Sequence, residues 1–249
     1  MSHTGPARKA DIVSHDLLVR IVRGDLAVGS LLPKEDDLAK QYDVNRSVIR
    51  EAIKLLEVHE LVRPVRKRGT VVLDPLATFS ADVVSAMLRP EPNRVDLLVL
   101  QGVLEVRATI DAQMMELVCA NRTKADLDAL EEALERVQKS KGAIDAYMGA
   151  HADLSLCLAR ATHNPIYPML VHWNRRVVAE LADLFRPIFA GAEAHATGLA
   201  MILQCIKKRD RVAARELVTT FHAWLNPRLL AAAALANGDD VRSALKEVS

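Results

Sequence analysis

Two arginines near residue 50 have the type and spacing for contacts to nucleic acid. Arg46 and Arg50 are four residues apart, so in a helix both side chains point to the same side. Their guanidinium groups can meet guanine edges or phosphates, and Ser47 beside them can reach a phosphate or a base edge. We therefore predict that these three residues contact DNA.

A second basic group lies directly before a glycine. Lys67 and Arg68 precede Gly69, and glycine permits a tight backbone turn, which predicts a hairpin with a basic tip. Basic side chains at such a tip can enter the minor groove or grip the phosphate backbone. Lys67, Arg68 and Gly69 complete the predicted DNA-binding set, whereas Arg63 and Arg66 are consistent either with phosphate contacts or with no contact.

The elements that must position these residues follow the order of a winged helix-turn-helix. Apolar residues first recur at helical spacing, and Asn45 is a good N-cap for the third helix. The period then changes to two, which predicts a pair of strands. Three helices and a basic hairpin in this order are typical of that DNA-binding module. The predicted elements are helices at 11–23, at 35–42 and from residue 46 onward, and strands at 61–65 and 70–73.

The rest of the chain has the composition and periodicity of an all-helical domain. Half of the residues are hydrophobic but only 4% are aromatic, which is typical of a helix-rich globular protein. The predicted fold is therefore mostly α: an N-terminal winged helix-turn-helix with a two-stranded wing, followed by an all-α bundle of about six helices. These helices are predicted near 94–120, 123–139, 143–162, 164–189, 192–209 and 210–236.

The predicted domain boundaries follow from these changes of pattern. Residues 1–75 form the winged helix-turn-helix, and residues 76–93 form a proline-punctuated linker with a short helix near 81–88. The all-helical domain spans 94–236, and residues 237–249 form a tail.

Several classes of protein are disfavoured by what the sequence lacks. The three cysteines are far apart and show no CxxC spacing: Cys119, Cys157 and Cys205. This spacing disfavours disulfides and favours a protein of the reducing cytoplasm. The formal net charge is only +1, and no apolar run reaches the roughly 18 to 20 residues of a membrane helix. Phosphate-binding loops, GxSxG and HExxH are missing too. We expect a cytoplasmic protein that is not an enzyme and has no membrane partner; a metal-dependent hydrolase using Asp153 is the weaker alternative.

Parts of the N-terminal region resemble the DNA-binding signature of the GntR family. They are Pro33-Lys-Glu-Asp-Asp-Leu-Ala, Tyr42-Asp-Val-Asn-Arg-Ser-Val-Ile-Arg-Glu-Ala-Ile-Lys-Leu-Leu-Glu, Leu61-Val and Lys67-Arg-Gly-Thr. The resemblance implies that the recognition-helix arginines are Arg46 and Arg50 and that the wing-tip contact is Arg68-Gly69. One departure is Asp36, which stands where many members have an arginine that contacts phosphate; Lys34 is a candidate substitute.

The C-terminal domain resembles the FCD-type ligand-binding domain of the FadR subfamily. The similar segments are Glu105-Val-Arg107 and Ala161-Thr-His-Asn164-Pro165. This resemblance implies that residues 94–236 bind a small-molecule effector and dimerise. It further implies a homodimer that binds a palindromic double-stranded operator, most often as a repressor that the effector releases.

Many members of that subfamily bind a divalent metal through an aspartate, a histidine four residues later and two further histidines. The corresponding positions in this chain are His151, Ser155, Leu199 and Phe221. The resemblance therefore implies no metal cofactor. A non-standard metal site made by His151, His195 and His222 stays open as an alternative, because imidazoles are good ligands.

Arg107 is the leading candidate for contact with an anionic effector such as a carboxylate or an acyl compound. Its neighbours form an amphipathic pattern that places it near the bundle interior, where fixed positive charge can bind an anion. An ion pair with Glu105 or Asp111 is equally consistent with the sequence. His151 and Arg175 are further effector candidates. The alternative is a DNA-binding protein without an effector, which predicts a filled core.

Overall fold

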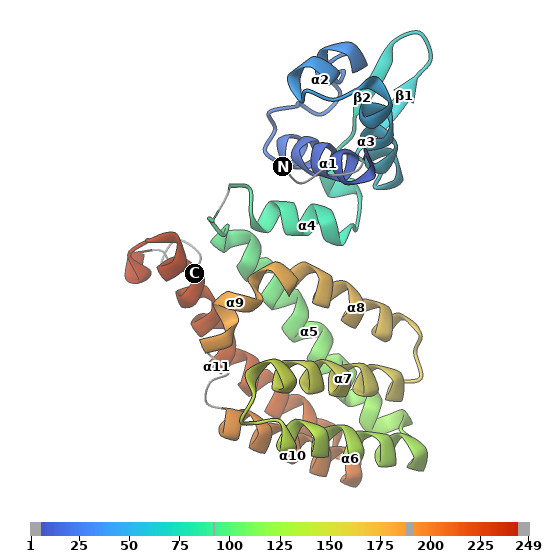
Figure 1. The fold of residues 1–249 in the computed structure, drawn as a ribbon. Coiled ribbons are helices and arrows are strands. Elements are labelled where there is room, and N and C mark those ends of the chain that lie inside the picture. The colour runs from blue at the N-terminus through green and yellow to red at the C-terminus, as the bar shows by residue number, and fades with distance from the viewer. Residues whose placement is uncertain (1–5, 92, 188–191, 244–249) are drawn as a thin grey trace. The chain divides into compact units, whose positions relative to one another are not determined.

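A computed structural model of the protein describes residues 6–91, 93–187 and 192–243 (Figure 1). The chain divides into two compact units, Met1–Arg94 and Val95–Ser249. Each unit buries a hydrophobic cluster of its own, so each is described by itself. None of the described helices is both long enough and apolar enough to cross a membrane.

The first unit contains the predicted winged helix-turn-helix. Its two strands are antiparallel, with Val62 opposite Val72 and Val65 opposite Gly69. The predicted fold class, with a two-stranded wing after three helices, is confirmed. The elements are α1 (Pro6–Val22), α2 (Glu35–Gln41), α3 (Arg46–Val58), β1 (Val62–Val65), β2 (Gly69–Val72), the 3-10 helix η1 (Pro75–Ala77) and α4 (Ala81–Leu88).

The wing is also paired with a short segment, residues 29–32, that the sequence did not predict. The backbone N–H of Leu32 donates to the carbonyl of Thr70 at 2.8 Å. The N–H of Gly29 donates to the carbonyl of Val72 at 2.9 Å. Leu31 forms an isolated β-bridge with Val71. This segment therefore lies along β2 on the side away from β1, which fixes the wing relative to the core.

The segment predicted as a linker, residues 76–93, belongs to the first unit. Helix α4 packs against α1, and its residues Val83 and Ala86 are buried in the first hydrophobic cluster. The end of α3 also contacts this segment, because the ring of His59 lies 3.3 Å from the hydroxyl of Ser80, directly before α4. The amphipathic face of α4 explains the difference from the prediction, since a buried helix face holds this segment to α1.

The second unit is the all-helical bundle that the sequence predicted. Helices α5 and α11 pack against each other along much of their length, and α6 packs against α7. The helix predicted at 164–189 is divided into three parts, and its last two residues lie outside the described residues. The elements are α5 (Leu97–Asn121), α6 (Lys124–Lys139), α7 (Ile144–Ala161), α8 (Ile166–Val178), the 3-10 helix η2 (Ala179–Leu181), α9 (Ala182–Phe185), α10 (Ala192–Lys208) and α11 (Arg211–Asn237).

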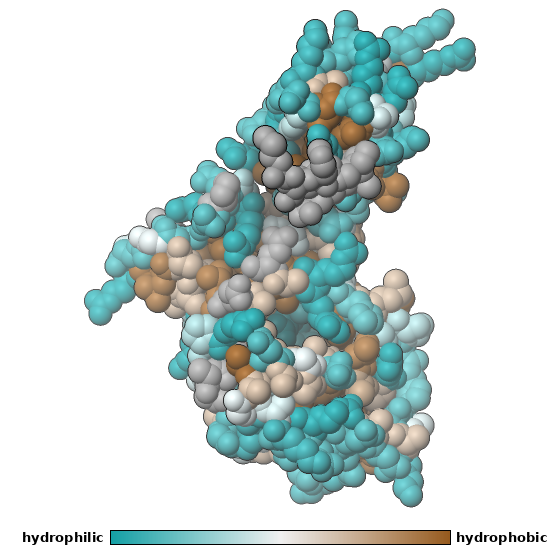
Figure 2. Space-filling model, viewed as in Figure 1, coloured by the Kyte–Doolittle hydropathy of each residue, from teal (hydrophilic) through white to brown (hydrophobic). Residues whose placement is uncertain are grey.

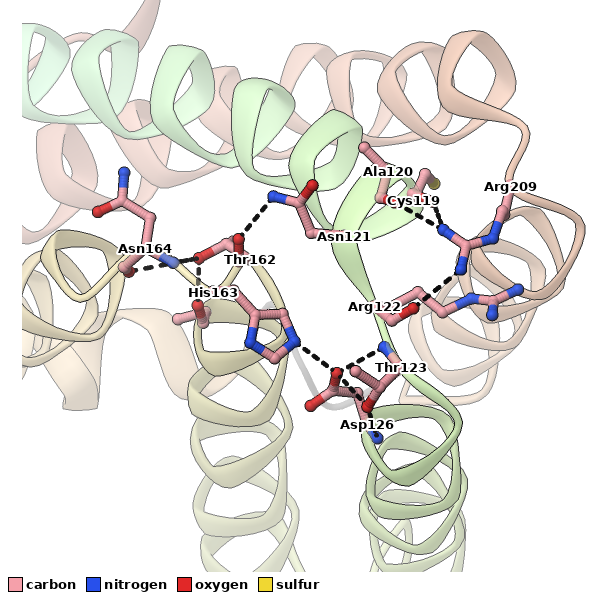
Figure 3. Close-up of polar contacts among 11 residues, drawn as sticks. Cys119, Ala120, Asn121, Arg122, Thr123, Asp126, Thr162, His163, Asn164 and Arg209 are labelled. Carbon is pink, nitrogen blue, oxygen red and sulfur yellow. Dashed lines mark hydrogen bonds and ion pairs between the residues drawn. The ribbon is translucent and has the colours of Figure 1, made fainter.

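Two arginines join helix ends at one end of the bundle (Figure 3). Arg209, just after α10, donates to the carbonyl oxygens of Cys119 at 3.0 Å, Ala120 at 2.6 Å and Arg122 at 3.0 Å. Arg122, just after α5, donates in return to two carbonyls at the end of α10, at 3.2 and 2.7 Å. Because the last carbonyls of a helix lack partners within it, each arginine caps the helix that the other follows.

Replacing Arg209 by glutamine should lower the free energy of unfolding by about 1 to 2 kcal/mol, because charged donors to otherwise unpaired carbonyls are lost. Urea unfolding followed by circular dichroism measures this change. Lys208→Gln is the matched control, because Lys208 directly precedes Arg209 and its side chain is exposed. This control should lower the free energy of unfolding by less than about 0.5 kcal/mol. Equal losses in the two variants would contradict the capping role.

Candidate nucleic-acid interface and interior polar cluster

Helix α3 presents the three predicted contact residues together on one exposed face. The side chain of Asn45 accepts a hydrogen bond from the N–H of Val48 at 3.0 Å, which caps the helix and sets where it begins. Arg46 and Arg50 follow with 64% and 63% of their side chains exposed. Ser47 is also exposed, and its hydroxyl donates to the Asn45 side chain at 2.7 Å. The opposite face of α3 is buried in the hydrophobic cluster.

Both arginines form ion pairs with acids in the first turn of α2. The Nε atom of Arg46 pairs with the carboxylate of Asp36. The Nε atom of Arg50 lies 2.8 Å from Oε2 of Glu35. The sequence showed that Asp36 departs from the family pattern, but it gave no sign that the acid would meet Arg46.

The tip of the wing combines positive charge with a backbone that requires glycine. The N–H of Arg68 donates to the carbonyl of Val65 at 3.0 Å and closes the turn. Lys67 has φ 62° and Gly69 has φ 120°, and the second angle lies where side chains are rarely tolerated. Lys67, Arg68 and Gly69 are all exposed, and hydrophilic side chains project from the end of the hairpin in Figure 2.

A polar cluster lies inside the helical unit, where α7, α10 and α11 meet. The hydroxyl of Tyr147 lies 2.6 Å from Nδ1 of His195. The ring of His195 lies 4.9 Å from that of His151, and it stacks on Phe221 at the same centroid distance. Two imidazoles and a phenol are therefore grouped against an aromatic ring.

Helix α5 contributes a pair of opposite charges to this interior. Nε of Arg107 lies 3.5 Å from Oδ2 of Asp111, so the structure contains the ion pair that the sequence allowed. The same oxygen of Asp111 lies 3.0 Å from Nε2 of His222 on α11. Each of these side chains is at most 25% exposed. Asp111 thus links two helices through one carboxylate.

The protonation states of the cluster follow from burial and from Arg107. Burial lowers the pKa of His151 to about 3 and that of His195 to about 4, and the positive charge of Arg107 adds to both shifts. Burial alone would raise the pKa of Asp111, but the hydrogen bond from His222 and the charge of Arg107 outweigh it, and the pKa is lowered. At neutral pH the rings of His151 and His195 are therefore neutral, and Arg107 and Asp111 carry opposite charges.

The structure brings only part of the predicted effector set together. Arg107 and His151 belong to the interior group, since the charge of Arg107 acts on the His151 ring. Arg175 is exposed in the last turn of α8 and shares none of the contacts described for this cluster. Sequence reasoning missed Tyr147, although it precedes His151 by four residues and so lies on the same face of α7.

The alternative metal site made by His151, His195 and His222 is not supported by the geometry. His195 is engaged by Tyr147, and His222 is engaged by Asp111. Within the described parts of the chain, no three His, Cys, Asp or Glu side chains are placed to hold a metal ion. At two of the positions where the subfamily has metal ligands, Ser155 donates to the carbonyl of His151 at 3.0 Å and Phe221 stacks on His195. This donor set does not fit the subfamily's metal.

Comparison with known proteins assigns the family. Residues 9–72 match the sequence model described as bacterial regulatory proteins, gntR family, and residues 102–223 match that of the FCD domain. The chain is 30% identical over 210 residues to the uncharacterized HTH-type transcriptional regulator Rv0494 of Mycobacterium tuberculosis, covering 84% of each chain. The chain belongs to the GntR family. This GntR-family protein is accordingly a DNA-binding transcription regulator.

Two further relatives are similar to this GntR-family protein. It is 30% identical over 171 residues to the HTH-type transcriptional regulator LutR of Bacillus subtilis, covering 67% of this chain and 72% of LutR. The solved structure of Lar, which controls the expression of the Listeria monocytogenes agr system, has 19% identity and a TM-score of 0.58. That match covers 88% of this chain and 95% of Lar, and it shows a shared fold.

The stability of this GntR-family protein should fall as the pH is lowered from about 7 to about 5. In the unfolded chain His195 regains a pKa of about 6.5 and takes up a proton, whereas the folded state, with a pKa of about 4, does not. Protons then favour unfolding, and His195 alone should account for about 2 kcal/mol over this range.

The variant His195→Gln tests this origin, because glutamine can still hydrogen bond to Tyr147 but does not titrate. Urea unfolding at several pH values should show a shallower pH dependence than the wild type. His172→Gln, at an exposed position on α8, should keep the wild-type dependence. An unchanged pH dependence in His195→Gln would show that the buried ring is not the titrating group.

Proposed function

We propose that this protein is a cytoplasmic homodimeric repressor of the FadR subfamily. Its affinity for a palindromic operator is controlled by a small carboxylate or acyl metabolite that binds in the helical unit. The observation that carries the DNA-binding part is the exposed pair Arg46 and Arg50 at the capped start of α3.

In this proposal α3 lies in the major groove and the wing lies beside it. Arg46 and Arg50 offer forked donors to guanine edges, and Ser47 reaches a phosphate or a base. Lys67 and Arg68 meet the minor groove or the backbone, with Gly69 shaping the turn. A homodimer would place two such helices on half-sites about one helical turn apart.

The effector part of the proposal is based on the interior polar cluster. Arg107 supplies the fixed cation that an anionic head group needs, and the neutral ring of His151 supplies a polar atom beside it. A carboxylate ligand would compete with Asp111 for Arg107, and so would disturb the link from Asp111 to His222 on α11. An effector acts only through its different affinities for the two states of the dimer, so this link is where the states would differ.

Replacing Arg46 or Arg50 by alanine should weaken operator binding by roughly 10- to 100-fold, because a bidentate guanine contact contributes about 1 to 3 kcal/mol. The wild-type protein first selects its operator from a random duplex pool, and fluorescence anisotropy then gives the Kd of each variant. Lys124→Ala, at an exposed position on α6, removes the same charge and should bind normally. Wild-type affinity in both arginine variants would contradict the assignment.

The effector site is tested with the double variant Arg107→Met with Asp111→Asn, which removes both charges and leaves no unpaired carboxylate in the interior. A panel of hydroxy acids, sugar acids, fatty acids and acyl-CoA esters is screened by the shift in Tm. We expect at least one compound to stabilise the wild type and to lose at least about tenfold in affinity in the double variant. Arg175→Met is the control for a charge at an exposed position.

Equal binding of that compound by the double variant and the wild type would contradict the role of Arg107. A panel that shifts neither the Tm nor the operator affinity of the wild type would favour the DNA-binding regulator without an effector.

A further inference from the structure

The first turn of α2 is acidic and faces the arginines that we assign to DNA. Glu35 and Asp36 pair with Arg50 and Arg46, as described above. These acids are 40% and 47% exposed, so they lie on the surface beside the DNA-contact face and not in the core. A negative charge in that place opposes the approach of a phosphate backbone.

Stability does not account for these ion pairs. Exposed pairs of this kind contribute little to the free energy of unfolding, because water screens their attraction. The packing of α2 on α3 comes from the hydrophobic cluster, in which Leu38 and Ile49 are fully buried. We therefore expect the acids to affect DNA binding, because they change which DNA groups Arg46 and Arg50 can contact.

The atoms involved separate two kinds of DNA contact. Both ion pairs use Nε of the guanidinium group. The two terminal nitrogens of each arginine can still form the fork that pairs with O6 and N7 of guanine. Contact with a phosphate brings a second anion to the same group, close to the acid, and like charges at short range repel.

We propose that Asp36 and Glu35 determine specificity, by competing with phosphates for Arg46 and Arg50 while leaving guanine readout available. The proposal rests on the DNA-contact role of the two arginines. Duplexes of unrelated sequence offer mainly phosphates, so the acids lower their affinity more than that of the operator. They thereby widen the ratio between specific and non-specific binding, which decides how a regulator is distributed on a genome.

The test compares Asp36→Asn with Asp37→Asn. Asp37 lies in the same turn, is exposed, and forms no side-chain ion pair or hydrogen bond in the described part of the chain. The two variants therefore change the net charge equally, and only Asp36→Asn releases an arginine. The probes are the operator duplex selected by the wild-type protein and a duplex of the same length and composition with scrambled sequence. Anisotropy titrations of the full-length protein at several KCl concentrations give Kd and its salt dependence.

We expect Asp36→Asn to bind the scrambled duplex at least about threefold more tightly than Asp37→Asn does, with a smaller increase in affinity for the operator. The slope of log K against log salt on the scrambled duplex should steepen by about 0.9 for each additional phosphate that the protein neutralises. Glu35→Gln should behave as Asp36→Asn does. A merely structural role for Asp36 would change thermal stability but not this slope.

Equal effects of Asp36→Asn and Asp37→Asn on both duplexes would overturn the proposal, because only the net charge would then matter. A loss of operator affinity in Asp36→Asn with unchanged affinity for the scrambled duplex would overturn it too. Failure of the DNA-contact role itself has a different signature, which is wild-type operator affinity in Arg46→Ala and Arg50→Ala.

Discussion

The carboxylate of Asp111 is the charge around which the interior of the helical unit is arranged. A buried anion is costly unless it is paired, and Arg107 and His222 supply the partners. Because one partner lies with it on α5 and the other lies on α11, the requirement for pairing also joins the two helices that pack most extensively. Burial is the main reason that His151 and His195 stay neutral, and the charge of Arg107 disfavours their protonation further.

The first unit also contains ion pairs between arginines and acids, but these pairs contribute little to stability. Arg46 and Arg50 meet their acids at the surface, where water screens the attraction and little stability is gained. Exposed pairs can be exchanged for other partners at low cost, whereas breaking the interior pair would leave a charge poorly solvated. Burial thus separates exposed pairs on the DNA-contact face from an interior pair that lies largely away from water.

The sequence predicted the elements well and their contacts less well, for a physical reason. Apolar periodicity reports which face of a helix is buried, and this was enough for α3, the wing and the bundle. The pairing of residues 29–32 with β2 was missed, because so short a segment with glycine and serine is typical of a turn. The contact between Asp36 and Arg46 depends on how α2 crosses α3, and the exposure of Arg175 depends on which face of α8 is packed. Neither property can be predicted from the spacing of residues along the sequence.

The reciprocal capping by Arg122 and Arg209 has a consequence for how the bundle opens. Each arginine lies just beyond one helix and holds the last carbonyls of the other, so fraying at the end of α5 would withdraw the donors that close α10. Opening of one end therefore favours opening of the other, and their amides should exchange hydrogen with correlated rates.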